Sequence, residues 1–171
     1  MPLFPALPDA FDEIADLVNR AYRGTEGWTH EGEYIDGQRT DPHTLRADLA
    51  AAPKAELLTL RDTADGPLLG VVWLEPTDKD VWYLGMLTVR PDIQDRQLGR
   101  GLLAEAEAHV KRGGGRRVRM TVVSLREPLI AWYVRRGYVL TGETEPFPYE
   151  NQTLGAPRRD DLAFVVLEKG I

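Results

Sequence analysis

The stretch from Val81 to Leu103 constrains the fold more than any other part of the chain. It reads VWYLGMLTVRPDIQDRQLGRGLL: an apolar strand-like run, a proline, a polar turn with glycine, and then an amphipathic helix. The start of a helix exposes unpaired backbone N–H groups and the positive end of the helix dipole. The stretch therefore predicts a phosphate-binding turn.

Two glycines in this turn support that interpretation. Gly99 and Gly101 fall in the first helical turn, where each costs about 1 kcal/mol relative to alanine. Close approach of a ligand would explain the glycines, but so would helix capping and tight helix packing. The G-x-G-x-x-G spacing of dinucleotide-binding folds is missing, which argues against a dinucleotide fold.

The rest of the chain alternates strands and helices without a repeat or a long linker. Asp9 is expected to cap the first helix, and Asp41 with Pro42 the second. Helices are predicted over about Asp9–Tyr22, Asp41–Ala51, Leu98–Arg112 and Pro128–Gly137. Strands are predicted at Leu3–Phe4, Glu56–Arg61, Leu68–Leu74, Val81–Val89, Val118–Val123, Tyr138–Thr141 and Leu162–Leu167. This order predicts an α/β (α+β) fold in a single domain over residues 1–171, with about six to seven strands in a mixed sheet and helices on both faces.

Composition narrows the class of protein. The 171 residues include no cysteine, which excludes disulfides, thiolate metal sites and a cysteine nucleophile. No apolar run approaches the roughly 20 residues that span a bilayer, and the N-terminus lacks signal-peptide character. We therefore expect a cytoplasmic protein without a membrane partner. The net charge of −6 argues against a nucleic-acid partner, and the three histidines lack metal-ligand spacing.

Charge is distributed unevenly. The stretch from Arg90 to Arg136 carries a net charge of +6, and the remainder of the chain carries −12. Either the basic residues form salt bridges on a solvated helix face, or they form a site for one polyanionic ligand. Charge alone leaves both interpretations open.

The turn resembles the pyrophosphate motif of the GNAT superfamily of N-acetyltransferases, [QR]-x-x-G-x-[GA] after a strand that ends in L-x-V-x-P. The strand end is Leu87-Thr88-Val89-Arg90-Pro91, and the turn is Gln94-Asp95-Arg96-Gln97-Leu98-Gly99-Arg100. Gln94 and Gly99 match, whereas Gln97 replaces the first glycine. A second register, Arg96-x-x-Gly99-x-Gly101, also fits, but the first leaves the usual interval after Pro91.

A second segment supports the resemblance. Ala131-Trp132-Tyr133-Val134-Arg135-Arg136-Gly137-Tyr138 is similar to the family's A-x-x-x-[FY]-Y-x-x-x-G-[FY] pattern. Seven residues before Tyr133, Arg126 stands where the family often has asparagine. The motifs cover about Leu68 to Thr141, and the element order covers the whole chain.

The resemblance implies that acetyl-CoA lies between two splayed strands, Val81–Val89 and Val118–Val123. It also implies a backbone N–H near Leu87 that polarises the thioester carbonyl. The residues expected to bind acetyl-CoA are Leu87, Thr88, Val89, Gln94, Asp95, Arg96, Gln97, Leu98, Gly99, Arg100 and Arg126.

Tyr133 matches the family's general acid, because a phenol is protonated at neutral pH and can donate to the departing sulfur. A buried structural tyrosine is the alternative. The sequence identifies no general base: Glu75, Glu145 and His30 are candidates, and Tyr83 stands where one branch of the family carries a glutamate.

Two loops, Gly24–Gln38 and Glu143–Asp161, are expected to shape the acceptor site. The candidate acceptor-binding residues are Trp28, His30, Tyr34, Tyr83, Phe147 and Tyr149. Aromatic rings beside carboxylates suit a cationic amine. The alternative is that the rings only pack the loops. Alternatively Arg39, Arg158 or Arg159 would receive a substrate carboxylate.

The resemblance implies an acetyl-CoA-dependent N-acetyltransferase that acts on a primary amine, either a small molecule or a peptide amino terminus, by direct attack. The first alternative is a non-catalytic acyl-CoA sensor of the same fold, and the second is a nucleotide-binding module. The acceptor, the general base and a homodimeric state remain undetermined by the sequence.

Overall fold

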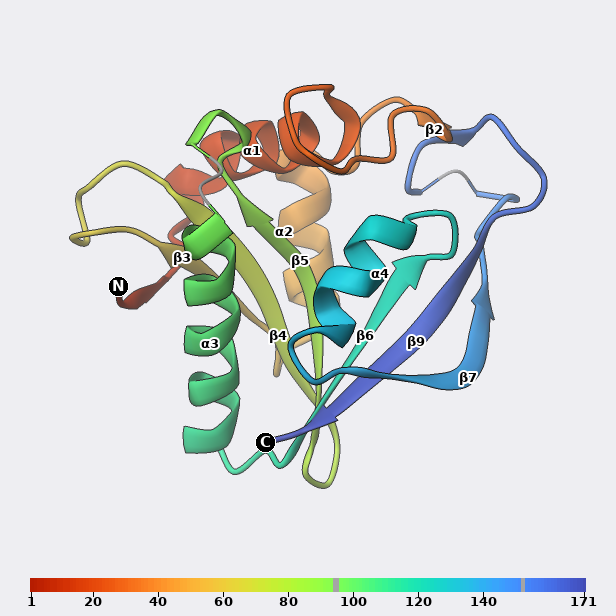
Figure 1. Ribbon diagram of the computed structural model, residues 1–171. Helices are drawn as coiled ribbons and strands as arrows, with labels where there is room; N and C mark the ends of the chain where they lie inside the picture. The colour runs from red at the N-terminus through yellow and green to blue at the C-terminus, as the bar shows by residue number, and fades with distance from the viewer. Residues whose placement is uncertain (94–95, 152) are drawn as a thin grey trace.

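The computed structural model describes residues 1–93, 96–151 and 153–171, and its centre is a seven-stranded mixed sheet of order β1-β3-β4-β5-β6-β9-β7 (Figure 1). Among the described strands of this sheet, only β5 and β6 pair in parallel. Its strands are β1 (Leu3–Pro5), β3 (Glu56–Leu60), β4 (Gly70–Asp78), β5 (Val81–Val89), β6 (Arg117–Val123), β7 (Val139–Pro146) and β9 (Ala163–Gly170). The helical elements are η1 (Pro8–Ala10), α1 (Phe11–Arg23), α2 (Pro42–Ala51), η2 (Pro91–Ile93), α3 (Arg96–Arg112) and α4 (Glu127–Val134).

Helices cover both faces of the sheet, as predicted. On one face α1 and α2 bury Ile14 and Leu45 against strand residues such as Val71. On the other face α3 and α4 bury residues such as Leu102 and Tyr133 (Figure 1). The predicted fold class is therefore confirmed. No helix in the described ranges is long and apolar enough to cross a membrane.

The two central strands separate after a short paired segment. β5 pairs with β6 only over Val81–Tyr83, opposite Arg117–Arg119, although β5 continues to Val89. Beyond Tyr83, the side of β5 that faces β6 therefore has no strand partner, although β5 still pairs with β4 on its other side. This is the splayed strand pair expected from the sequence.

A β-bulge in β5 accompanies the separation. Against β4, Val71 pairs with Thr88 and Trp73 pairs with Gly85, so two residues of β5 face one residue of β4. Met86 takes a positive φ of 54°, a conformation that costs a non-glycine residue roughly 1–3 kcal/mol. The hydroxyl of Thr88 donates to the Met86 carbonyl at 2.9 Å, which helps to hold the bulge.

Two predictions for the N-terminal half need correction. The first helix begins at Phe11, and Asp9 lies in the preceding 3-10 turn without capping it, because Pro8 starts a turn of its own. The predicted loop 24–38 also contains the two-residue strand β2 (Ile35–Asp36). The Asp41 cap is confirmed, since its carboxylate accepts from the Thr44 amide at 2.8 Å.

The predicted loop 143–161 also contains regular structure. β7 extends to Pro146, and β8 (Ala156–Pro157) pairs with β2. Short pairs between distant loops carry no local hydrophobic period, so the sequence pattern could not reveal them.

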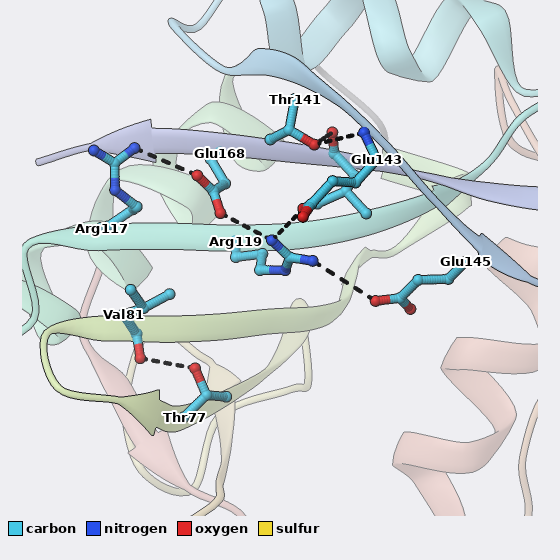
Figure 2. A network of polar contacts seen from close by, with 9 residues as sticks. Thr77, Val81, Arg117, Arg119, Thr141, Glu143, Glu145 and Glu168 are labelled. Atoms are coloured by element: carbon cyan, nitrogen blue, oxygen red, sulfur yellow. Dashed lines mark hydrogen bonds and ion pairs between the residues drawn. The ribbon is translucent and has the colours of Figure 1, made fainter.

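Ion pairs across β6, β9 and β7 account for part of the positive stretch. Arg119 contacts Glu143 at 2.7 Å, Glu168 at 3.0 Å and Glu145 at 3.9 Å, and Arg117 reaches Glu168 at 3.5 Å (Figure 2). These two arginines therefore form salt bridges, but on strand β6 and not on the helix face that the sequence predicted.

Candidate active site

Two cavities lie where β5 and β6 separate. The large cavity, of about 610 Å³, is walled by the end of β5, the first turns of α3, and α4. The small cavity, of about 280 Å³, lies between the separated halves of β5 and β6 and is bordered by both predicted acceptor loops. The residues that line both cavities are Tyr22, Leu87, Arg126, Leu129 and Tyr133. The cavities therefore adjoin along a shared wall.

Several residues predicted to bind acetyl-CoA line the large cavity: Leu87, Thr88, Val89, Gly99 and Arg126. Gln97, Leu98 and Arg100 lie in the first turns of α3 and outside the cavity lining. Arg96 is the first residue of α3. Gln94 and Asp95, and the side chain of Arg96, lie outside the described residues, so the prediction for them stands untested.

The two glycines of α3 have different surroundings. Gly99 lines the large cavity, and a Cβ atom there would lie 3.6 Å from the ring of Trp132. A Cβ atom on Gly101 would meet nothing within 4 Å among the described residues. Gly99 belongs to both motif registers, but Gly101, the last position of the register that begins at Arg96, lines neither cavity. This difference favours the register that begins at Gln94.

Tyr133 comes from α4, which begins with Pro128 in its first turn and ends before the left-handed Gly137. The side chain is buried, with its ring edge-to-face against Trp132 and Tyr138. Burial raises the pKa of the Tyr133 phenol far above its usual value. The hydroxyl therefore stays protonated at physiological pH, as a general acid requires.

Arg126 precedes α4 and has a buried acidic partner that sequence reasoning missed. Its Nη1 lies 3.4 Å from Glu31, and Arg23 approaches the other oxygen of the same carboxylate at 3.4 Å. The Arg126 guanidinium also lies over the Tyr22 ring, 5.3 Å from its centroid. Glu31 is 95 residues from Arg126 in sequence, so no local pattern links them.

Arg23 joins the two acceptor loops. Its Nη1 donates to the Gly37 carbonyl at 3.1 Å, and its Nη2 donates to the Leu154 carbonyl. Together with the β2–β8 pair, these contacts connect the loop before α2 with the loop before β9. The loops therefore form one wall of the small cavity.

Arginines that sequence reasoning did not assign lie at the large cavity. Arg135 and Arg136 line it. The Arg136 guanidinium stacks on Trp132 at 3.8 Å, and burial lowers its pKa, with smaller contributions from the charges of Arg100 and Arg135. Neither Arg135 nor Arg136 has an acidic partner within 4.0 Å among the described residues, and the same is true of Arg100, which the sequence analysis did assign. The charge of these arginines is therefore available to an anion.

Five of the six predicted acceptor residues divide into three groups. Tyr83 and Phe147 line the small cavity, and Trp28 lines the large one. Tyr34 and Tyr149 pack in the core of the two loops, where the Tyr149 hydroxyl accepts from the Leu162 amide at 2.7 Å.

His30 forms a local turn, since its Nδ1 accepts from the Gly32 amide at 3.2 Å, and it lines neither cavity. Of the other two candidate bases, Glu145 lines the small cavity, whereas Glu75 accepts from the Trp73 indole and stays outside both. Within the described ranges, no group of three or more metal-ligating side chains comes together.

Comparison with solved structures finds the same fold. The ribosomal-protein-alanine N-acetyltransferase of Brucella melitensis matches with a TM-score of 0.70 and 15% identity, over 100% of both chains. The PaiA N-acetyltransferase of Thermoplasma acidophilum, in complex with coenzyme A, matches with a TM-score of 0.68 and 16% identity, over 99% of this chain and 98% of that one. Nourseothricin acetyltransferase matches with a TM-score of 0.56 and 19% identity, over 69% of this chain and 66% of that one.

A search of curated proteins finds no match. A sequence model of the acetyltransferase (GNAT) family matches residues 11–138. This range contains the splayed strands, the first turn of α3 and Tyr133, and the match confirms the family expected from the two motifs. The chain therefore belongs to the GNAT family of acetyltransferases, enzymes that use acetyl-CoA as co-substrate.

Proposed function

We propose that the chain transfers the acetyl group of acetyl-CoA to a primary amine that attacks the thioester directly, with Tyr133 as general acid. The observation that carries this proposal is the place of Tyr133, whose side chain lines both cavities. A donor bound in the large cavity and an amine bound in the small one would meet beside this residue.

The large cavity fits acetyl-CoA, as the coenzyme A bound to the Thermoplasma relative suggests. The side of β5 without a strand partner offers backbone groups of Leu87 and Val89 to the pantetheine arm, as an added strand would use them. The N–H groups at the start of α3 would hold the pyrophosphate, with added charge from Arg100, Arg135 and Arg136. When bound, acetyl-CoA supplies an activated acyl carbon.

The bulge in β5 would stabilise the negative charge that develops on the thioester carbonyl oxygen during attack. A bulge leaves one residue of the strand unpaired, and here the extra residue falls at Met86 or Leu87. An unpaired N–H near Leu87 would donate to the carbonyl oxygen as negative charge develops on it.

Proton transfers complete the reaction. As the carbon–sulfur bond breaks, the Tyr133 hydroxyl gives its proton to the departing sulfur and is later reprotonated from solvent. The attacking nitrogen loses one proton when its bond to the acyl carbon forms. Glu145 is the one of the three candidate bases that lines the small cavity, so we assign that proton to Glu145, directly or through water.

A screen of primary amines for thiol release from acetyl-CoA tests the proposal, with mass spectrometry to identify the N-acetyl product. Intact-mass measurement after incubation with acetyl-CoA alone should show no acetylated protein, because direct attack forms no acyl-enzyme. Detection of an acetyl-enzyme on the reaction path would contradict direct attack. Acetyl-CoA binding without thiol release for any amine would favour the non-catalytic sensor.

A further inference from the structure

We infer that the acceptor amine carries a carboxylate, and that Arg39 and Arg126 bind this carboxylate in the small cavity. The inference rests on the proposed function, because it names the chemical class of the amine. It assigns the acceptor to free amino acids rather than to polyamines or protein amino termini, which lack a carboxylate beside the reacting nitrogen.

Arg39 is the first observation. Arg158 and Arg159 each pair with a nearby aspartate, at 3.6 and 2.7 Å, and line neither cavity. Arg39 lines the small cavity, and its guanidinium has no ion pair within 4.0 Å in the described part of the chain. Its neighbour is the Tyr22 ring, 5.6 Å from the guanidinium carbon to the centroid. The guanidinium is therefore free to bind an anion.

Arg126 is the second, independent observation. The side chain of Arg126 is buried, since the residue is 6% exposed, and its Nε has no hydrogen-bond partner among the described residues. Buried charged donors are normally satisfied, and an orphaned one is costly to keep. Because Arg126 lines the small cavity and lies over the same Tyr22 ring as Arg39, one ligand anion at this ring can serve both guanidinium groups.

The charges around the small cavity indicate that the bound group is negatively charged. Arg23 and Arg126 each approach one oxygen of the buried Glu31 carboxylate. Burial lowers the pKa of Arg23, and the positive charge of Arg39 contributes to this shift. Asp48 is coupled to Arg39 through its charge but forms no ion pair with it.

The three arginines against one carboxylate give the cluster of Arg23, Arg39, Arg126 and Glu31 a net positive charge. Glu145, the other carboxylate that lines the small cavity, lies 3.9 Å from Arg119. A substrate carboxylate would offer its two acceptor oxygens to the guanidinium groups of Arg39 and Arg126.

The remaining walls indicate the side chain of the substrate. Ile35, Phe147 and Phe164 line the small cavity and belong to one buried apolar cluster. An apolar or aromatic side chain suits this surface. Leucine, phenylalanine and tryptophan are therefore the probes of choice, each compared with its amide and with its decarboxylated amine.

The experiment measures kcat/KM for each probe set in the wild type and in three variants. In the wild type, kcat/KM for each amino acid should exceed kcat/KM for its amide and for its decarboxylated amine by about 10- to 100-fold, the range of a charge-assisted bidentate contact. Arg39→Gln should lower this ratio several-fold and leave the part that Arg126 supplies, and Arg39→Lys should lower it less. Arg116→Gln, which removes an exposed charge on the loop before β6, should leave the ratio unchanged.

The ratio between probes is an internal control, since a folding defect lowers all rates together. Calorimetric binding of N-acetyl-leucine against N-acetyl-3-methylbutylamine, with coenzyme A present, gives a second readout that needs no turnover. Equal rates for amino acids and decarboxylated amines, or an unchanged ratio in Arg39→Gln, would overturn the inference and leave the proposed function intact. If no amine is acetylated, the proposed function fails, and the binding measurement still decides whether the carboxylate is recognised.

Discussion

Tyr133 and Tyr138 meet edge-to-face with ring centroids 5.6 Å apart, yet their hydroxyl groups have different surroundings. The Tyr138 hydroxyl donates to Glu107 at 2.9 Å, and Glu107 also binds Lys169. Tyr133 instead lines both cavities. Of the two buried tyrosines of this motif, Tyr138 therefore has a structural role and Tyr133 is the candidate general acid.

Tyr133→Phe should lower kcat by about 100-fold, the lower end of the range for general acid catalysis, because a thiolate leaves without full protonation more readily than an alkoxide. Coenzyme A affinity should change less than about fivefold. Steady-state kinetics and calorimetry check these values. Tyr138→Phe is the matched control: it should lose about 1–2 kcal/mol of stability and keep its kcat. Similar kcat values for the two variants would return Tyr133 to a structural role.

The buried tyrosines also predict a loss of stability at alkaline pH. Burial raises the pKa of Tyr138 in the folded state far above its unfolded value of about 10, with a further contribution from Glu107. Stability from this group is fully present below pH 10 and falls as the pH rises toward the folded pKa, by up to about 1.4 kcal/mol per pH unit. Urea unfolding at pH 8 to 11.5 measures this decline. The decline should be smaller in Tyr138→Phe, and an identical slope would refute the assignment.

Gly99→Asp should abolish coenzyme A binding through bulk and charge repulsion where the cavity meets α3. Gly101→Ala should preserve binding and raise stability by about 0.5–1 kcal/mol, because a Cβ there meets nothing within 4 Å in the part of the chain that the structure describes. Thermal unfolding with and without coenzyme A measures binding in both variants. In the wild type, coenzyme A at 100 times its dissociation constant adds about 2.7 kcal/mol to the free energy of unfolding, which raises the melting temperature by roughly 5–10 °C. Loss of the shift in Gly101→Ala alone would show that the other motif register is correct.

Arg100→Ala should weaken coenzyme A binding by about 1–2 kcal/mol, the scale of one charge-assisted hydrogen bond. Backbone N–H groups at the start of α3 are expected to supply most of the phosphate affinity. Calorimetry at two salt concentrations tests this division. A complete loss of binding in Arg100→Ala would shift the main contact from the backbone to the side chain.

Glu31→Gln should destabilise the protein by about 3 kcal/mol, since it leaves Arg23 and Arg126 buried without their shared negative charge. Chemical denaturation measures the change. The exposed Glu143, which pairs with Arg119, provides the comparison: Glu143→Gln should cost less than about 1 kcal/mol. Equal effects of the two variants would mean that the buried cluster contributes little.

Local signals in the sequence predicted the parts of the fold that local physics determines. The Asp41-Pro42 start of α2 was predicted because a cap and a proline act within one turn. The strand–turn–helix from Val81 to Leu103 was predicted because periodicity and turn residues are read over short windows. The sheet and its helices follow from these elements.

The candidate site depends more on distant contacts, and these escaped prediction. Nothing near Arg126 in sequence points to Glu31 or to Tyr22, because the three meet only when the loop before α2 folds against α4. The positive φ of Met86 is similarly hidden, since methionine gives no turn signal. Tertiary context imposes the bulge that separates the strands.

The contacts of Arg23 and the β2–β8 pair limit how acceptor preference can change among relatives. The segments 24–38 and 153–161 contact each other through the β2–β8 pair and through the hydrogen bonds of Arg23. Replacing one segment alone would therefore break these contacts. New acceptor specificity should therefore be inherited or transplanted as a matched pair of loops, while the sheet and α3 retain the donor site.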